Sequence, residues 1–275
     1  MAKTVQDYLR PQFMPHIWCP GCGHGITLNA MLRAIAKLDL DKDKVCVVSG
    51  IGCASRLPGY VDFNTLHTTH GRAIAFATGI KLAKPELTVI VVTGDGDGAA
   101  IGGNHLIHAA RRNIGLTVVM FNNAIYGMTS GQYSPMTPSG KTATTAPYGN
   151  IERDFDICKL VQAAGANYVA RATVAQPRQL STYIERAITT KGFAFVEAQC
   201  MCPTYYGRRN KLGGPVEMLD MLRKNTVTMQ AAAKLSPEEL RGKIITGELH
   251  KAEDPEYCEL YDDLIRRAQE EVAGK

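Results

Sequence analysis

The sequence has no long hydrophobic run. Its longest apolar segment, LTVIVVTG at 87–94, is far shorter than the roughly 18 residues that a membrane-spanning helix needs. The opening segment, MAKTVQDYLRPQFMP, also lacks the apolar centre of a signal peptide. We therefore expect a cytoplasmic protein that does not associate with a membrane. In the reducing cytosol, cysteine pairs serve metals, clusters or catalysis rather than structural disulfides.

Dense basic stripes, internal repeats and low-complexity linkers are absent as well. The net charge of +5 is modest, and the basic clusters at 111–112, 205–211 and 265–267 are too sparse for a nucleic-acid-binding surface. We expect no nucleic-acid partner, although a mildly basic surface suits an acidic electron carrier. With 275 residues, 45% of them apolar and 21% charged, the chain has the composition of one large globular domain.

Short β-rich apolar runs alternate with helical patterns between residues 25 and 200. The predicted strands are 44–50, 87–94, 116–122 and 193–200, and the predicted helices are 25–38, 71–83, 101–113, 154–164 and 176–190. This alternation indicates an α/β fold in which helices cover both faces of a parallel sheet. We expect this domain to span residues 1–203. Residues 204–275 are predicted to be a charged, helical extension that packs on the domain and on a partner subunit.

Two long connections, 51–66 and 123–150, interrupt the alternation. Loops of this length in a compact domain are usually functional. Both begin at the carboxyl end of a predicted strand, and open α/β sheets bind their ligands at those ends. The sequence therefore predicts a ligand site at this edge of the sheet.

The segment GDGDG follows one predicted strand directly, and NNAIYG ends the next. Gly94, Gly96 and Gly98 let the backbone approach a ligand closely, and amides at a helix start favour phosphate. Asp95 offers the hard oxygen that Mg²⁺ prefers. An isolated Gly-Asp-Gly is a common turn, but its pairing with Asn122 and Asn123 one helix and one strand later resembles the thiamine diphosphate fingerprint.

That resemblance implies a metal site and a partner. Asp95, the Asn123 side chain and the carbonyl oxygen of Ile125 would hold the Mg²⁺ that bridges the two phosphates. Thiamine enzymes place the glutamate that engages the aminopyrimidine ring on a second α/β domain. Because this chain has one such domain, the resemblance implies an α subunit that carries the pyrimidine-side domain. The chain alone should then be inactive.

The eight cysteines divide into two groups. Cys46, Cys158 and Cys258 lie in strand or helix patterns and are interpreted as structural. The others are Cys19 and Cys22 in WCPGCGHG, Cys53 in GIGCASR, and Cys200 and Cys202 in EAQCMCPT. A redox dithiol is disfavoured because a proline-interrupted segment, not a strand, precedes the first pair. The cysteines alone leave a zinc site and a four-thiolate cluster equally open.

The combination of motifs is more specific. WCPGCGHG, GIGCASRLPGY, HTTHGRAIAFATGIKLA, GDGDG and NNAIYGMTSGQYSPMTP occur in this order. Over roughly residues 15–210 the chain resembles the β subunit of the 2-oxoacid:ferredoxin oxidoreductases. The resemblance implies that Cys19, Cys22 and Cys53 bind a [4Fe–4S] cluster. The fourth ligand corresponds to Cys202, with Cys200 as the alternative because residues i and i+2 of an extended segment share a face.

The resemblance also implies the residues around the cofactor. Arg56 is expected to act as a cation near the substrate carboxylates, and His70 as a polar contact to the cofactor; both are predicted as catalytic. His24, His105 and His108 are interpreted as capping, packing or supporting residues. The predicted cofactor-binding residues are Ile51, Gly52, Cys53, His67, His70, Gly71, Gly94, Asp95, Gly96, Asp97, Asn123, Ile125, Gly127, Met128 and Thr129.

The implied reaction is oxidative decarboxylation of a 2-oxoacid, with coenzyme A as co-substrate and electrons passing singly through the cluster to ferredoxin. The motifs are most like those of members that use 2-oxoglutarate, and Arg56 suits its second carboxylate. Pyruvate and branched-chain 2-oxoacids are alternatives, as are a thiamine half-enzyme without electron transfer and a non-catalytic iron–sulfur or zinc protein. The expected assembly is a heterodimer or a dimer of heterodimers.

Overall fold

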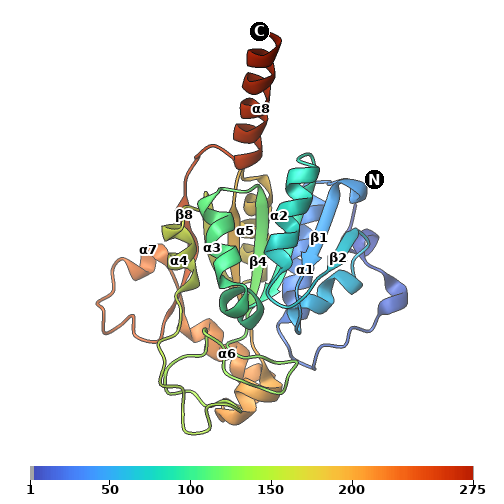
Figure 1. Cartoon of the computed structure of the whole chain (residues 1–275). Coiled ribbons are helices and arrows are strands. Elements are labelled where there is room, and N and C mark those ends of the chain that lie inside the picture. Colours follow the sequence, from blue (N-terminus) through green and yellow to red (C-terminus); the bar gives the residue numbers. More distant parts are fainter. Residues whose placement is uncertain (1–2, 275) are drawn as a thin grey trace.

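The computed structural model describes residues 3–274, which form an eight-stranded sheet with helices on both faces (Figure 1). The strands are β1 (Val45–Ser49), β2 (Asn64–His67), β3 (Thr88–Gly94), β4 (Leu116–Asn122), β5 (Tyr168–Thr173), β6 (Ala194–Gln199), β7 (Thr226–Thr228) and β8 (Ile244–Lys251). Their spatial order is β2-β1-β3-β4-β6-β5-β8-β7. From β2 to β5 every neighbouring pair is parallel, whereas β8 runs antiparallel to β5.

The helices divide the core into two layers. On one face lie α1 (His24–Lys37) and α5 (Pro177–Thr189); on the other lie α2 (Ala73–Ala83), α3 (Gly103–Arg111) and α4 (Ile157–Ala163). Alternate residues of each central strand enter the two layers, so that Ile90 joins the first and Val91 the second. Burial on both faces explains why the central strands read as continuous apolar runs. Each such side chain contributes about 1.5–3 kcal/mol through burial.

The remaining elements are short or C-terminal. They are α6 (Pro215–Asn225), α7 (Met229–Ala232) and α8 (Tyr257–Ala273), the 3₁₀ turns η1 (Val5–Tyr8), η2 (Pro11–Phe13), η3 (Lys42–Lys44) and η4 (Ala54–Gly59), and the π turns η5 (Gly96–Ile101) and η6 (Pro203–Gly207). No helix within residues 3–274 combines the length and the hydrophobicity that crossing a bilayer requires.

The predicted α/β fold is confirmed, and every predicted strand and helix between 25 and 200 is present within a few residues. Two strands were missed. β2 lies at the end of the connection 51–66, where only four residues pair along the sheet edge. β5 was missed because its central Arg171 interrupts an otherwise buried run. That arginine is paired with the buried Glu197, so the polar residue does not exclude a strand.

The C-terminal extension is more than a helical appendage. Residues 244–251 form strand β8, which pairs with β5 and extends the domain's own sheet; the expectation of helix there was wrong. The β-branched sequence Ile244-Ile245-Thr246 favours a strand over a helix. Helix α8 projects away from the body (Figure 1), and Leu260 and Leu264 on it are about half exposed. Packing of the extension against a partner subunit stays a prediction.

The parallel strands place their carboxyl ends at one edge of the sheet. The loops that follow β1, β3, β4 and β6 meet there, together with η6 and α6, at the end opposite α8 (Figure 1). This edge therefore carries both long connections and all of the motifs identified in the sequence.

Candidate active site

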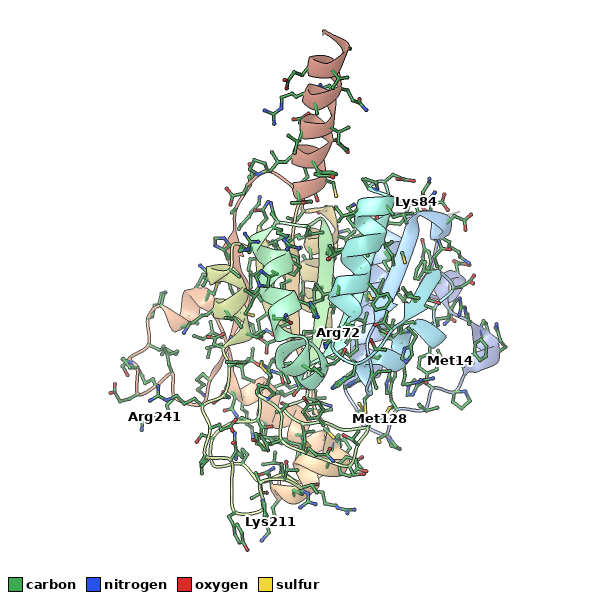
Figure 2. All side chains as sticks on the ribbon, in the orientation of Figure 1. Met14, Arg72, Lys84, Met128, Lys211 and Arg241 are labelled. Atoms are coloured by element: carbon green, nitrogen blue, oxygen red, sulfur yellow. The ribbon has the colours of Figure 1, made fainter. Side chains whose placement is uncertain are left out.

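A pocket of about 230 Å³ lies at the carboxyl ends of β1, β3 and β4. Most predicted cofactor-binding residues line it: Ile51, Gly52, Cys53, His70, Gly94, Asp95, Gly96, Asp97, Asn123, Ile125, Gly127, Met128 and Thr129. Met128 is 44% exposed and lies at the same end of the molecule as Lys211 of the extension (Figure 2). The structure therefore brings most of the predicted residues together in one pocket, and their role in cofactor binding stays a prediction.

Three predicted residues are not in the pocket wall. Exposed His67 ends β2, and its Nδ1 lies 3.0 Å from the Ser49 hydroxyl instead. Gly71 lies behind the wall, where its amide binds the Asp97 carboxylate. Arg56 extends from η4 to solvent. The spacing of His67 and Arg56 from the motifs did not reveal the direction of their side chains.

Residues 94–98, which we call the phosphate loop, begin at the end of β3. At two of its positions the neighbouring side chains leave room only for glycine. A Cβ on Gly96 would lie 2.3 Å from the Tyr126 ring, whose hydroxyl donates a 2.9 Å hydrogen bond to the Gly96 carbonyl. A Cβ on Gly98 would lie 2.8 Å from the Met120 and Thr93 side chains. At Gly96 and Gly98 the turn η5 can therefore pack against these neighbours only without a side chain, which brings its backbone close to the pocket.

Three oxygen atoms converge beside this loop. The amide oxygen of Asn123 lies 3.1 Å from Asp95 Oδ1 and 2.7 Å from the carbonyl oxygen of Ile125, and it faces no donor. Rotating the amide places Nδ2 there instead, where it donates to both oxygens, so in either orientation the polar atoms of Asp95, Asn123 and Ile125 converge on one place. Ala124, with φ of +60°, turns the chain so that its two neighbours point to the same place.

The electrostatics of Asp95 fit a cation at this position. The side chain is 2% exposed and forms no ion pair with any base among residues 3–274. Burial raises the pKa of Asp95 to about 7, although Ser134 Oγ donates a 2.5 Å hydrogen bond to it. A buried carboxylate, an amide oxygen and a carbonyl oxygen form a donor set suited to Mg²⁺. The residues present therefore fit the metal that the sequence implied.

Asp97 joins the loops around the pocket. Its Oδ1 accepts hydrogen bonds from the backbone amides of Ile51 and Gly71, at 3.2 and 2.7 Å, and its Oδ2 accepts one from Thr93 Oγ1 at 2.8 Å. His70 Nδ1 also donates to Oδ1, at 2.7 Å. Since protein donors occupy both oxygens, Asp97 positions the loops after β1, β2 and β3. It also fixes the His70 tautomer, which leaves Nε2 as an acceptor.

A second buried network supports the turn at Ala124, between the predicted metal ligands Asn123 and Ile125. Asn122 Nδ2 donates to Glu197 at 2.7 Å, and Asn122 Oδ1 accepts from the amide of Ala124 at 3.0 Å. Glu197 is fully buried and pairs with Arg171 Nε at 2.6 Å. Burial lowers the pKa of Arg171, but the Glu197 carboxylate outweighs it and raises the value. The ion pair therefore fixes the position of the Asn122 side chain, which in turn fixes the backbone at Ala124.

The predicted cluster ligands gather on the other side of the pocket wall. Trp18 Nε1 donates a 2.7 Å hydrogen bond to the Cys53 carbonyl, which joins the first cysteine motif to the second. Burial, with smaller contributions from Cys202 and Cys19, raises the pKa of Cys22 to about 12 and that of Cys53 to about 11. The four thiols therefore form one neighbourhood, drawn from three segments of the chain.

The spacing of these thiols bears on the choice of metal. Zinc binds thiolates at about 2.3 Å, which requires its ligands to be in near contact. Among residues 3–274 no group of three or more cysteine, histidine or acidic side chains is close enough to hold a single ion. A four-iron cluster binds each thiolate to a different iron and so needs a wider set. The preference for a cluster over zinc therefore rests on the resemblance of the sequence motifs, and it stays a prediction.

Cys200 and Cys202, the two candidates for the fourth ligand, lie in different surroundings. The Cys200 thiol is buried in the core under α1, 3.5 Å from Thr27 Oγ1 and 3.3 Å from the carbonyl of Ala198. Cys202 contributes to the raised pKa of both Cys22 and Cys53, whereas Cys200 interacts with Cys22. This placement favours Cys202 as the fourth ligand, as the sequence suggested.

The pocket also contains residues that the sequence reasoning did not assign to it, namely His24, Ala54, Phe121 and Tyr126. The position of Tyr126 inside NNAIYG was an available signal, since neighbouring residues of the motif were predicted. His24, two residues after Cys22, was taken for a supporting residue. Phe121 and Ala54 carry no polar group that a motif search detects.

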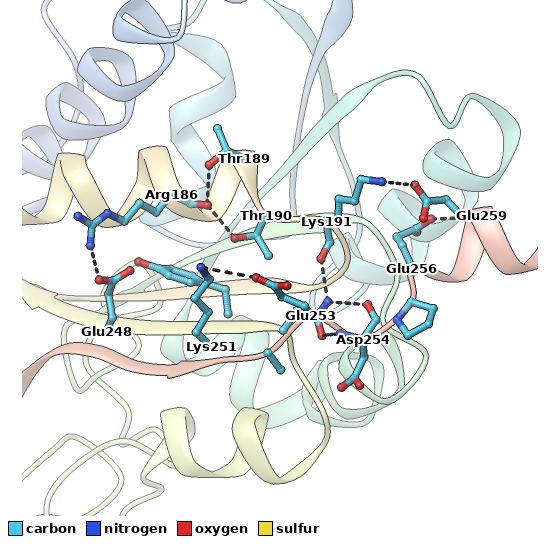
Figure 3. Close-up of a pocket in the computed structure, with 14 residues that line it drawn as sticks. Arg186, Thr189, Thr190, Lys191, Glu248, Lys251, Glu253, Asp254, Glu256 and Glu259 are labelled. Atoms are coloured by element: carbon cyan, nitrogen blue, oxygen red, sulfur yellow. Dashed lines mark hydrogen bonds and ion pairs between the residues drawn. The ribbon is translucent and has the colours of Figure 1, made fainter.

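A larger hollow of about 790 Å³ lies at the opposite edge of the sheet, near the start of α8 (Figure 3). Six of its charged side chains pair with one another: Arg186 with Glu248, Lys191 with Glu259, and Lys251 with Glu253. The Glu256 carboxylate accepts hydrogen bonds from the amides of Cys258 and Glu259, so most charges of the hollow are already paired within the chain. The smaller pocket at the carboxyl edge is therefore the candidate active site.

Comparison with known proteins decides the family. Residues 44–198 match the family described as thiamine pyrophosphate enzyme, C-terminal TPP binding domain. The chain is 54% identical to the 2-oxoglutarate synthase subunit KorB of Methanothermobacter marburgensis over 268 residues, which cover 98% of this chain and 93% of that one. It is also 54% identical to the KorB subunit of Methanocaldococcus jannaschii, with 96% and 98% covered. The chain belongs to the KorB family of 2-oxoglutarate synthase subunits.

A solved structure agrees with this KorB assignment. A 2-oxoglutarate:ferredoxin oxidoreductase from Magnetococcus marinus, with 2-oxoglutarate, coenzyme A and succinyl-CoA bound, superposes with a TM-score of 0.87 at 38% identity. The match covers 97% of this chain and 91% of that one. The resemblance to the 2-oxoacid:ferredoxin oxidoreductases inferred from the sequence motifs is confirmed, and the matched family model spans β1 to β6 with the pocket.

Proposed function

We propose that this chain is the β subunit of a 2-oxoglutarate:ferredoxin oxidoreductase. With its partner subunit it converts 2-oxoglutarate, coenzyme A and two oxidised ferredoxins to succinyl-CoA, CO₂, two reduced ferredoxins and one proton, and the reaction is reversible. What supports the proposal is one pocket in which the polar groups of Asp95, Asn123 and Ile125 converge and which Cys53, a predicted cluster ligand, also lines. An electron-transferring thiamine enzyme needs both a metal site and a cluster.

Different residues of the chain bind the metal ion, the diphosphate and the cluster. Asp95, Asn123 and the Ile125 carbonyl hold Mg²⁺, and the backbone of η5 lies against the diphosphate. Cys19, Cys22, Cys53 and Cys202 hold the cluster. Bound thiamine diphosphate supplies the nucleophilic carbon for decarboxylation, and a bound cluster accepts electrons one at a time.

His70 and Arg56 are assigned to polar recognition. Asp97 holds the proton of His70 on Nδ1, so Nε2 accepts a hydrogen bond in the pocket. Arg56 forms no ion pair within residues 3–274 and extends to solvent. A free guanidinium near the pocket suits the distal carboxylate of 2-oxoglutarate once the partner subunit closes the site.

The absence of a glutamate from the pocket lining indicates a partner subunit. The residues that line the pocket include no glutamate to engage the aminopyrimidine ring, so an α subunit with the pyrimidine-side domain must provide one. Ferredoxin accepts the electrons. We propose a heterodimer or a dimer of heterodimers in the cytoplasm, with no membrane or nucleic-acid partner.

A substrate panel tests the proposal. The chain is purified anaerobically with its α subunit and assayed with 2-oxoglutarate, pyruvate and branched-chain 2-oxoacids, together with coenzyme A and a low-potential dye. We expect the highest kcat/KM with 2-oxoglutarate. A higher value with another 2-oxoacid would reassign the substrate, and no turnover with any of them would contradict the reaction class.

A further inference from the structure

A buried histidine in the wall of the pocket has no role in the site as described so far. His24 begins α1, lines the pocket and is 1% exposed. The sequence suggested only capping, packing or support for it. A fully buried imidazole between a cofactor pocket and a group of cysteines is costly unless its polar atoms are used.

One ring nitrogen is in contact with a predicted cluster ligand. His24 Nδ1 lies 3.1 Å from the Sγ of Cys22. The ring is held in this direction by Trp18, with ring centroids 5.8 Å apart, and by the edge-on ring of Phe121 at 5.2 Å. The intervening Gly23 packs tightly as well, since a Cβ there would lie 3.1 Å from Val174 and 3.3 Å from Cys200. The contact is therefore fixed by the surrounding core.

The chemistry of the two groups determines where the proton lies. An imidazole carries an N–H on at least one ring nitrogen in either protonation state. A thiolate bound to iron has no proton and can only accept. The proton must therefore reside on Nδ1, and Nε2 has no hydrogen-bond partner among residues 3–274.

We propose that His24 is a positioning residue that donates an N–H···S hydrogen bond to Cys22 and thereby raises the reduction potential of the cluster. The inference rests on the proposed function, because it requires the cluster. Reduction adds one electron and moves no proton, and the added negative charge is shared by the thiolates. A donor aimed at one of them stabilises the reduced form, which makes the potential less negative.

This position also relates the cluster to the pocket. His24 lines the pocket that would hold the cofactor and contacts a cluster ligand on its other side. Electrons that leave the pocket for the cluster therefore arrive next to the residue that sets the cluster's potential. A less favourable potential would slow that transfer without weakening substrate binding.

Two variants separate hydrogen bonding from packing. His24→Leu removes both nitrogens and keeps an apolar side chain of similar size. His24→Asn keeps an N–H at the atom equivalent to Nδ1, since both atoms are attached to Cγ. His108→Leu is the matched control, because His108 is an exposed residue on α3. Each is made in the chain co-purified anaerobically with its α subunit.

The measurement is the midpoint potential of the cluster, from redox titration followed by electron paramagnetic resonance. We expect a more negative potential in His24→Leu, recovery of most of the shift in His24→Asn, and the wild-type value in His108→Leu. In wild-type protein with ¹⁵N-histidine, pulsed spectra of the reduced cluster should show a weak coupling to a histidine nitrogen. This second measurement does not depend on the folding of a variant.

Several outcomes would overturn the inference. They are an unchanged potential in His24→Leu at full iron content, an equal shift in His24→Asn and His24→Leu, or no histidine coupling in the wild-type cluster. A wild-type complex without iron would contradict the proposed function itself, together with this inference. The two failures are therefore told apart by the iron content of the wild-type protein.

Discussion

The indole nitrogen of Trp18 donates a 2.7 Å hydrogen bond to the carbonyl oxygen of Cys53. Trp18 is the only tryptophan of the chain, and its buried ring packs edge-on against Tyr60. The bond crosses between two segments that each supply a predicted cluster ligand. It therefore fixes the distance between the Cys19–Cys22 turn and Cys53 before any cluster binds.

Replacing Trp18 with Phe should loosen this connection. The variant keeps an aromatic ring but leaves the Cys53 carbonyl with only the 3.3 Å hydrogen bond from the Arg56 amide. We expect a loss of about 1–2 kcal/mol in the free energy of unfolding, measured by urea denaturation, and fewer irons per chain. Tyr148→Phe, at a fully exposed ring, is the control. Unchanged iron content in Trp18→Phe would show that the bond does not organise the ligands.

Replacing a glycine of the phosphate loop and replacing a glycine at the start of α3 should have opposite effects. In Gly96→Ala the new methyl group would lie 2.3 Å from Tyr126, so the ring and the loop must separate. We expect at least a tenfold loss of affinity for thiamine diphosphate, measured by calorimetry on the assembled complex. In Gly103→Ala the methyl group meets nothing within 4 Å inside helix α3, and stability should rise by about 0.5–1 kcal/mol. Equal affinities in the two variants would contradict the loop's assigned role.

The fourth cluster ligand can be decided by two serine variants. Cys202→Ser should lower the iron content and bleach the visible chromophore of the anaerobically purified complex, because Cys202 is electrostatically coupled to both Cys22 and Cys53. Cys200→Ser should retain iron, since that thiol is engaged with Thr27 and Ala198 in the core. The reverse pattern would assign the ligand to Cys200.

The buried ion pair under the metal site should be costly to break. Arg171→Met leaves the Glu197 carboxylate buried without its charged partner, and we expect a loss of about 3–5 kcal/mol in the free energy of unfolding. Because Glu197 holds Asn122, magnesium affinity should fall as well. Lys159→Met, which removes an exposed ion pair with Asp156, should change stability by less than about 0.5 kcal/mol. Similar effects for both variants would contradict the importance of burial.

The parts of the structure that the sequence predicted are those with local signals. Strand β3 reads as an unbroken apolar run because both its faces are buried, and the glycines around Asp95 mark a close backbone approach. The missed parts depend on distant partners. Strand β5 was not predicted because Arg171 interrupts its apolar pattern, and the partner that neutralises this arginine, Glu197, lies on another strand. The joining role of Asp97 and the direction of His67 are set by loops that meet only in the folded chain.

The central claim is that electrons from a 2-oxoacid in this pocket enter a cluster held by this chain. It is tested most directly by mixing the anaerobic complex with 2-oxoglutarate and coenzyme A, without ferredoxin, and recording the paramagnetic resonance spectrum. We predict a signal from a reduced four-iron cluster that depends on 2-oxoglutarate and is absent in Asp95→Asn. A complex that contains thiamine diphosphate and the cluster, yet shows no cluster reduction on adding 2-oxoglutarate, would contradict the account.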